Sequence, residues 1–185
     1  MKHYFITYRP FLQFLGIFLF SYLILIMSYQ FYLGQYDFAN YEVDYFTDLV
    51  ARQTQSFLTF LNYSIVLYDS THDPSVVVQI EGTPLVRIVE GCNALSVMIL
   101  FASFIMAFSK GFVKTAGFIA AGLLIIHVLN VSRIGLLTIG IMNFPEYKHL
   151  LHGVVFPLII YGIVFLLWIL WITKFVKNDS KNNPA

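Results

Sequence analysis

Long apolar stretches separated by polar segments dominate the pattern of the chain. Crossing the hydrocarbon core of a bilayer takes ~20 mostly apolar residues, and four stretches reach or approach that length. They predict membrane spans at about residues 11–33, 92–109, 112–142 and 152–173. The second stretch is short, whereas the third is longer than one membrane thickness. The first exceeds a signal-peptide core and lacks a small-residue cleavage site, so we interpret it as a retained anchor.

The segment between the first two spans, residues 34–91, carries two different patterns. Residues 41–68 place apolar side chains at helical spacing, which predicts an amphipathic helix on the outer membrane surface or across the end of the bundle. Residues 75–89 contain two β-rich runs around Glu-Gly-Thr-Pro, which predict a β-hairpin. We therefore expect an all-α membrane protein: a four-transmembrane-helix bundle with an outer amphipathic helix and a small β-hairpin. One domain covers 1–177, and the polar tail 178–185 is expected to be disordered.

Composition supports a membrane location and argues against several classes of protein. Hydrophobic residues make up 58% of the chain and charged residues 11%, against about 25% charged in soluble domains. The formal charge of +1 argues against a nucleic-acid partner, which a basic excess would indicate. The single cysteine excludes an intramolecular disulfide. The sequence has no metal-ligand cluster and no phosphate-binding glycine loop, so we expect neither a metal nor another cofactor.

The charged residues separate into two groups if the chain crosses the membrane four times. One side receives Lys2, Arg9, Lys110, Lys114, Lys174, Lys177 and Lys181. The other side receives nine of the ten acidic residues, together with Arg52, Arg87 and Lys148. Because basic residues accumulate on the cytoplasmic side, the pattern predicts a multi-pass protein of the cytoplasmic (inner) membrane with both termini in the cytoplasm.

Three chemically capable residues fall at the outer ends of the predicted spans. Cys92, the only cysteine, lies where the second span begins, and His152 lies where the fourth begins. The third span rises from Phe112, so at ~1.5 Å per residue Arg133 lies about 30 Å up, near the outer boundary. Asn130 precedes Arg133 by three residues and shares its helix face. The topology therefore predicts a thiol, an imidazole and a guanidinium at one depth on the outer face.

Each of these residues also has a purely structural interpretation. A lone cysteine is usually a small inert hydrophobe, Arg133 can anchor its helix at the interface, and His152 or His149 can cap a helix. We interpret His127, deeper in the third span, as a packed polar residue bonded to a neighbouring helix. Taken together, however, the three groups are those that cysteine-based acyl transfer needs. They supply a nucleophile, a proton acceptor and donor, and a stabiliser of the oxyanion.

The sequences around these residues resemble those of the exosortase/archaeosortase family of membrane-embedded cysteine transpeptidases. The family pattern is a cysteine block, an arginine block of the form N-x-x-R-[IV], and a histidine that opens the last helix. Here these are "EGCNALSVM" with Cys92, "NVSRIGLL" with Asn130 and Arg133, and "HLLHGVVFP" with His152. The similarity runs from about residue 86 to 171, and the small size and the last-helix sequences most resemble the exosortase F branch of Bacteroidetes.

The resemblance implies a role for each of these residues. Cys92 would be the nucleophile, Arg133 the oxyanion stabiliser and His152 the acid/base. We expect Asn130 and Asn93, which flank these groups, to contact the substrate.

The chain departs from the family pattern at two positions. Asn93 follows the cysteine where many members have Ser or Thr, which affects the shape of the loop. Gly153 follows the histidine where many members have Asp, which removes a carboxylate that would orient the imidazole. Glu90 is a candidate replacement, although an exposed loop carboxylate is the simpler interpretation. His149 competes with His152 for the acid/base role.

The family resemblance implies processing of exported proteins that end in a short motif, a hydrophobic helix and a basic cluster. Cys92 would cleave this C-terminal sorting signal at the outer, periplasmic face through a thioester, which an amine or water then releases. Besides substrate, the partner is membrane lipid; the sequence does not give the motif, the acceptor or the oligomeric state. The main alternative is a non-enzymatic membrane scaffold or assembly partner. A small transporter lined by His127, Asn130 and Arg133 is less favoured, because no acid lies within the spans.

Overall fold

The computed structural model describes residues 8–109 and 111–176 of the 185-residue chain. Within them, the helical stretches long and apolar enough to span a membrane are Arg9–Leu33, Phe112–Asn143 and Pro145–Lys174. The first is α2, the second is α5, and the third contains α7, Phe156–Trp171. They correspond to the first, third and fourth predicted spans, and so support a membrane protein. The tail predicted to be disordered, 178–185, lies outside the described residues.

The second predicted span is a shorter helix than expected. α4 covers Leu95–Ala107, 13 residues, which makes it about 20 Å long against a hydrocarbon core of about 30 Å. Its start is delayed because Glu90–Cys92 forms a 3-10 turn, η2, and Ala94 takes a left-handed conformation with φ 66°. α4 thus begins three residues after and ends two residues before the span predicted at about 92–109. Among the described residues, no fourth helix of full spanning length is found.

The segment before α4 folds as a helix followed by a three-stranded antiparallel sheet, where only one hairpin was predicted. Its elements are η1 (Phe38–Asn40), α3 (Tyr45–Phe60), β1 (Ile65–Asp69), β2 (Ser75–Ile80) and β3 (Thr83–Val89). The β2–β3 hairpin is confirmed, and α3 confirms an amphipathic helix. The helix predicted over 41–68 is too long, because the chain turns at Asn62, with φ 68°, and then forms β1. β1 pairs with β2 and makes β2 the central strand.

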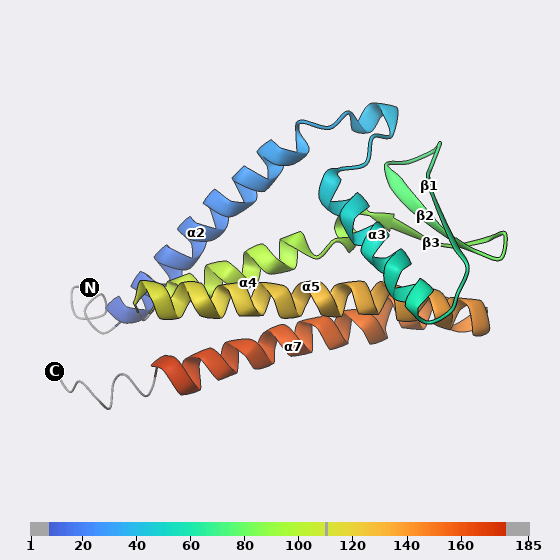
Figure 1. The fold of residues 1–185 in the computed structure, drawn as a ribbon. Coiled ribbons are helices and arrows are strands. Elements are labelled where there is room, and N and C mark those ends of the chain that lie inside the picture. The colour runs from blue at the N-terminus through green and yellow to red at the C-terminus, as the bar shows by residue number, and fades with distance from the viewer. Residues whose placement is uncertain (1–7, 110, 177–185) are drawn as a thin grey trace.

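The apolar helices run side by side, and the sheet lies at one end of them. α4, α5 and α7 are neighbours, α2 packs on α4, and α3 and the sheet sit together at the far end from the start of α2 and the end of α7 (Figure 1). Short helical elements flank α7: η3 (Pro145–Tyr147), α6 (Lys148–Leu150), the π-helical η4 (Leu151–Val155) and the π-helical η5 (Ile172–Val176). Helical geometry thus continues from α6 through α7.

Two hydrophobic cores hold these elements together. The first, named the outer core after the predicted topology, joins α3, the sheet and α5 through Val50, Ala51, Leu58, Val76, Val78, Ile88 and Ile134. The membrane core joins α4, α5 and α7 through Ala94, Met98, Phe101, Ile105, Ile126, Val164 and Trp171. Cys92 packs against the outer core, and two residues later Ala94 belongs to the membrane core. The β3–α4 loop therefore lies where the two cores meet.

Two glycines of α5 allow other helices to approach its backbone closely. A Cβ on Gly122 would lie 2.3 Å from the ring of Phe101 in α4, and one on Gly135 would lie 2.5 Å from the ring of Phe57 in α3. No side chain larger than hydrogen fits at those distances unless a ring moves. Small residues serve this purpose in membrane helix pairs, where close packing replaces the hydrophobic effect as the driving force.

Candidate active site

The loop that carries Cys92 is shaped by the residue after it. Glu90–Cys92 forms one 3-10 turn at the end of β3, and the Asn93 N–H donates to the Glu90 carbonyl at 3.2 Å. The side-chain oxygen of Asn93 accepts the N–H of Leu95 at 2.9 Å. This bond satisfies one of the free N–H groups at the start of α4. The turn leaves Cys92 partly buried.

Asn93 also joins the loop to α2 and α3. It is 1% exposed, and its side-chain amide donates to Thr47 Oγ1 at 3.1 Å and to Tyr29 Oη at 3.4 Å. The Tyr29 hydroxyl in turn donates to the Glu90 carboxylate. Removing one member would leave buried polar groups unpaired, which is costly. Asn93, expected from the sequence to contact substrate, therefore orients the loop and offers almost no surface to a ligand in this structure.

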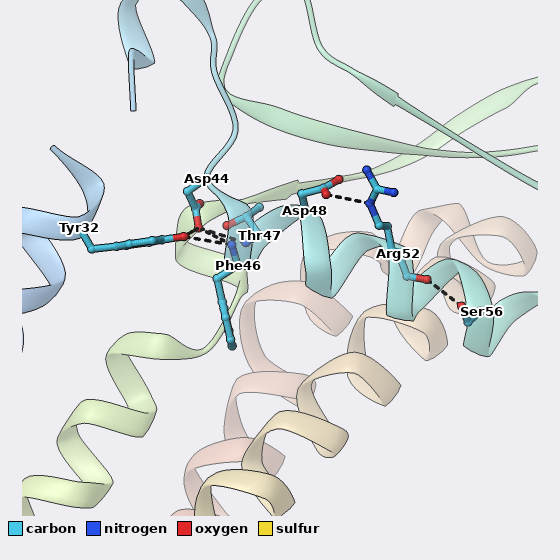
Figure 2. Close-up of polar contacts among 7 residues, drawn as sticks. All are labelled: Tyr32, Asp44, Phe46, Thr47, Asp48, Arg52 and Ser56. Atoms are coloured by element: carbon cyan, nitrogen blue, oxygen red, sulfur yellow. Dashed lines mark hydrogen bonds and ion pairs between the residues drawn. The ribbon is translucent and has the colours of Figure 1, made fainter. Parts of the chain in front are cut away.

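The start of α3, which contacts Asn93, is itself held by a buried carboxylate. Asp44, 1% exposed, accepts the N–H groups of Phe46 and Thr47 at 3.1 Å each. The Tyr32 hydroxyl of α2 donates to the same carboxylate at 3.2 Å (Figure 2). An N-cap aspartate stabilises the first turn by satisfying its free N–H groups. α2, α3 and the Cys92 loop thus form one connected polar network.

Asn130 connects Cys92 to Arg133. Asn130 is fully buried; its side-chain amide donates to the Cys92 carbonyl oxygen at 2.8 Å, and its Oδ1 accepts from Arg133 Nη1 at 3.4 Å. The Nε of Arg133 is buried and has no hydrogen-bond partner among the described residues. Within the same residues no carboxylate forms an ion pair with Arg133. The Arg133 guanidinium, which has unused donors, is therefore connected to the Cys92 backbone through the side-chain amide of Asn130.

His152 lies closer to the C-terminal end of α5 than Arg133 does. It is exposed and belongs to the π-helical turn Leu151–Val155. This wide turn precedes Pro157, which has no N–H to donate and disfavours regular helix before it. A Cβ on Gly140 would lie 3.0 Å from Leu151, so His152 is level with a part of α5 seven residues beyond Arg133, about 10 Å along the helix. No described hydrogen bond joins His152 to Cys92 or Arg133.

The other two histidines in this region have different environments. His127 Nε2 lies 2.6 Å from Gln53 Oε1 of α3, so the prediction of a packed residue bonded to a neighbouring helix is confirmed. His149, exposed and one turn before His152, does not line the cavity that His152 lines together with β3 and α5. Of the two candidates for the acid/base role, His152 is therefore the one that faces a cavity.

Sequence reasoning missed the residues that hold the loop from outside it. Tyr29, Thr47 and Asp44 lie 46 or more positions before Asn93 in the chain, and each contributes to the network. Asp44 had a readable signal, because an aspartate directly before a periodic apolar run is a common helix N-cap. Tyr29 had none, since aromatic residues fill the whole of α2.

The arrangement combines the partly buried thiol of Cys92, the hydrogen-bonded backbone carbonyl of the same residue, and the Arg133 guanidinium with unused donors. Such a set suits attack on a carbonyl carbon and stabilisation of the resulting oxyanion. Among the described residues, no group of three or more His, Cys, Asp or Glu side chains is placed to hold a metal ion. The chain matches no protein-family model, no curated protein and no solved structure.

Proposed function

We propose that the protein is a membrane-embedded cysteine transpeptidase or peptidase of exosortase type, which cleaves the C-terminal sorting signal of exported proteins. The observation that carries this proposal is the link from Cys92 through Asn130 to Arg133, whose buried Nε has no partner among the described residues. A buried, unpaired cationic donor is costly and marks a functional position in a membrane protein. An oxyanion formed beside Cys92 would supply the missing partner.

In the proposed reaction His152 takes the proton of the Cys92 thiol, and the thiolate bonds to the carbonyl carbon of the scissile peptide. Arg133 donates hydrogen bonds to the oxyanion, as a permanently charged guanidinium can do at any physiological pH. The C–N bond then breaks, His152 gives the leaving amine a proton, and a thioester remains on the enzyme. An incoming amine or water attacks the thioester and releases the product with the thiol restored.

His152 has to approach the thiol for this chemistry. Catalytic hydrogen bonds are often absent before substrate binds, and the π-helical turn Leu151–Val155 is a local irregularity that can adjust. The proposal therefore includes a movement of this turn, or a bridging water, when a peptide occupies the adjoining cavity.

The proposed topology has four crossings of the cytoplasmic membrane, with Cys92 at the outer face. α2 starts and α7 ends at the same end of the molecule, opposite to the sheet (Figure 1), as an even number of crossings requires. The sheet end carries most of the acidic residues, and basic residues gather near the other end. In this arrangement α4, at 13 residues, crosses with the help of the η2 turn and the loop to α5. An exported substrate halted by its own hydrophobic helix would present its motif at the level of Cys92.

The decisive experiment compares the C termini of surface and secreted proteins in cells that carry the native chain or Cys92→Ala. We expect mass spectrometry to find proteins that keep a hydrophobic, basic-ended tail only in the variant. Ser132→Ala is the control variant, because the described partner of the Ser132 hydroxyl is the Val128 carbonyl of the same helix. Immunoblots must show equal amounts of all three proteins in the membrane.

A non-enzymatic scaffold or assembly partner is the second candidate. It is favoured by one observation: Cys92 packs against the outer core, as an inert cysteine does. If Cys92→Ala is present at the native level and leaves every C terminus unchanged, the thiol has a packing role and the scaffold replaces the enzyme.

A further inference from the structure

A cavity of about 360 Å³ opens between the edge of the sheet and the outer end of α5. The described residues that line it are Val77 of β2, the β3 residues Pro84, Leu85, Val86 and Arg87, Leu137 and Ile141 of α5, and Lys148 and His152. Cavities of about 300–1,000 Å³ are typical of ligand sites. Leu137 follows Arg133 by one helical turn and Ile141 by two, so the cavity lies on the Arg133 side of α5. It therefore adjoins the proposed active site.

β3 offers this cavity an unpaired strand edge. In the order β1-β2-β3 it pairs only with β2, so its other edge keeps free N–H and C=O groups that can template an added strand. Pro84 has no N–H, and the register shift beside it places Leu85 in a bulge. The first half of β3 therefore cannot pair regularly with an added strand. In the half that stays open, residues 86–89, Val86 and Arg87 line the cavity, and the strand leads directly into the turn that carries Cys92.

The charged side chains that line the cavity are all basic. Arg87 and Lys148 line it with His152, and no acidic residue is among its described lining. Lys148 and His152 are four residues apart on one helical face. Arg87 Nη1 reaches Asp73 Oδ2 at 3.1 Å in an exposed ion pair, whereas no described ion pair involves Lys148. Since nine of the ten acids fall on the outer side, this is a basic site on an acidic face.

We propose that the cavity binds an extended, carboxylate-bearing peptide as an additional strand along residues 86–89. This inference rests on the proposed function, because it takes the peptide to be the substrate segment next to the bond that Cys92 attacks. At about 3.3 Å per residue the open edge accommodates a segment of similar length, roughly four residues. Backbone pairing would hold any sequence, so the selectivity for a carboxylate comes from Lys148 and Arg87. A lipid phosphate would use the same cations but would make no use of the strand edge.

The test measures peptide binding without turnover. Full-length Cys92→Ser protein in nanodiscs of zwitterionic lipid is titrated into short fluorescein-labelled peptides of alanine and threonine with one central Glu, Gln or Lys. Fluorescence polarisation should show the Glu peptide binding roughly tenfold more tightly than the Lys peptide, since one charge-assisted hydrogen bond is worth about that factor. Lys148→Gln combined with Arg87→Gln should abolish the preference. Arg52→Gln, which removes another exposed outer cation, should keep it.

Strand pairing has its own readout. Methylating one backbone nitrogen of the Glu peptide at a time should weaken binding at every second position, because only alternate N–H groups face the neighbouring strand. Equal affinities for the Glu, Gln and Lys peptides, or uniform tolerance of methylation, overturn the inference. So does full competition by vesicles of an anionic phospholipid, which would identify a headgroup site.

The outcome separates this inference from the proposed function. Peptide binding with no Cys92-dependent processing in cells supports the cavity and refutes the enzyme. Processing in cells with no charge preference in the nanodisc assay supports the enzyme and refutes the cavity.

Discussion

Replacing Asn130 by alanine tests the connection between α5 and the Cys92 loop. The Asn130 side chain, fully buried, is the described partner of the Cys92 carbonyl oxygen at 2.8 Å and of Arg133 Nη1 at 3.4 Å. Alanine removes both bonds without changing a charge. Asn143→Ala is the matched control, because the side chain of this exposed asparagine on the same helix has, among the described residues, one partner, the Ile139 carbonyl one turn earlier.

The expected cost follows from the geometry of the two bonds. The bond to Cys92 has ideal length, and its loss leaves a partly buried carbonyl unsatisfied, at about 1–3 kcal/mol. The bond to Arg133 exceeds the usual limit of about 3.2 Å and adds little. Alanine forms helices better than asparagine, which offsets the cost by about 0.5 kcal/mol. Asn130→Ala should therefore lower the free energy of unfolding by about 0.5–2.5 kcal/mol, whereas Asn143→Ala should stay within about 0.5 kcal/mol of the native protein.

Two measurements check this prediction. Denaturant unfolding in detergent micelles, followed by circular dichroism, gives the difference in stability. Iodoacetamide reports on the loop, because Cys92 is the only thiol in the chain, and it should react faster once its carbonyl is no longer held. Equal stabilities and equal alkylation rates in the Asn130→Ala and Asn143→Ala proteins would show that the amide link has no energetic role.

Two more predictions concern the helix packing and the charge of the outer region. Gly122→Ala should lower the free energy of unfolding by about 1–3 kcal/mol, because the new Cβ would lie 2.3 Å from the ring of Phe101. Gly117→Ala is the control and should be neutral or slightly stabilising, because a Cβ there would have no neighbour within 4 Å. Equal unfolding midpoints for the two variants would contradict the close approach. Hydrogen bonds, that from Ser70 first, hold the pKa of Asp73 at about 2, below its ordinary 3.8. This carboxylate therefore stabilises the fold above about pH 3.8 and loses that effect as the pH falls towards 2. Unfolding midpoints measured from neutral pH down to about 2 should fall less steeply in Asp73→Asn, and parallel curves would refute the assignment.

The candidate site was partly readable from the sequence. Counting 1.5 Å per residue from Phe112 brought Arg133 to the outer end of α5, and the structure joins it to Cys92 through Asn130. His152 was expected at the same depth because it opens the fourth predicted span, but it lies level with a part of α5 about two turns beyond Arg133. The difference arises because helical geometry before Pro157 begins at Lys148 and widens into a π-turn, an irregularity that hydrophobic length does not encode.

The sequence by itself determined which segments are apolar helices, because a stretch of about 20 apolar residues in lipid leaves the backbone no alternative to helix. It also determined the β2–β3 hairpin and α3 through side-chain periodicity. Only the tertiary structure decided that α4 is short, that β1 completes the sheet, and that Tyr29 holds Glu90 at a separation of 61 residues. Periodicity describes what each segment buries, whereas the pairing of polar groups depends on distances between segments, and those exist only once the helices have packed.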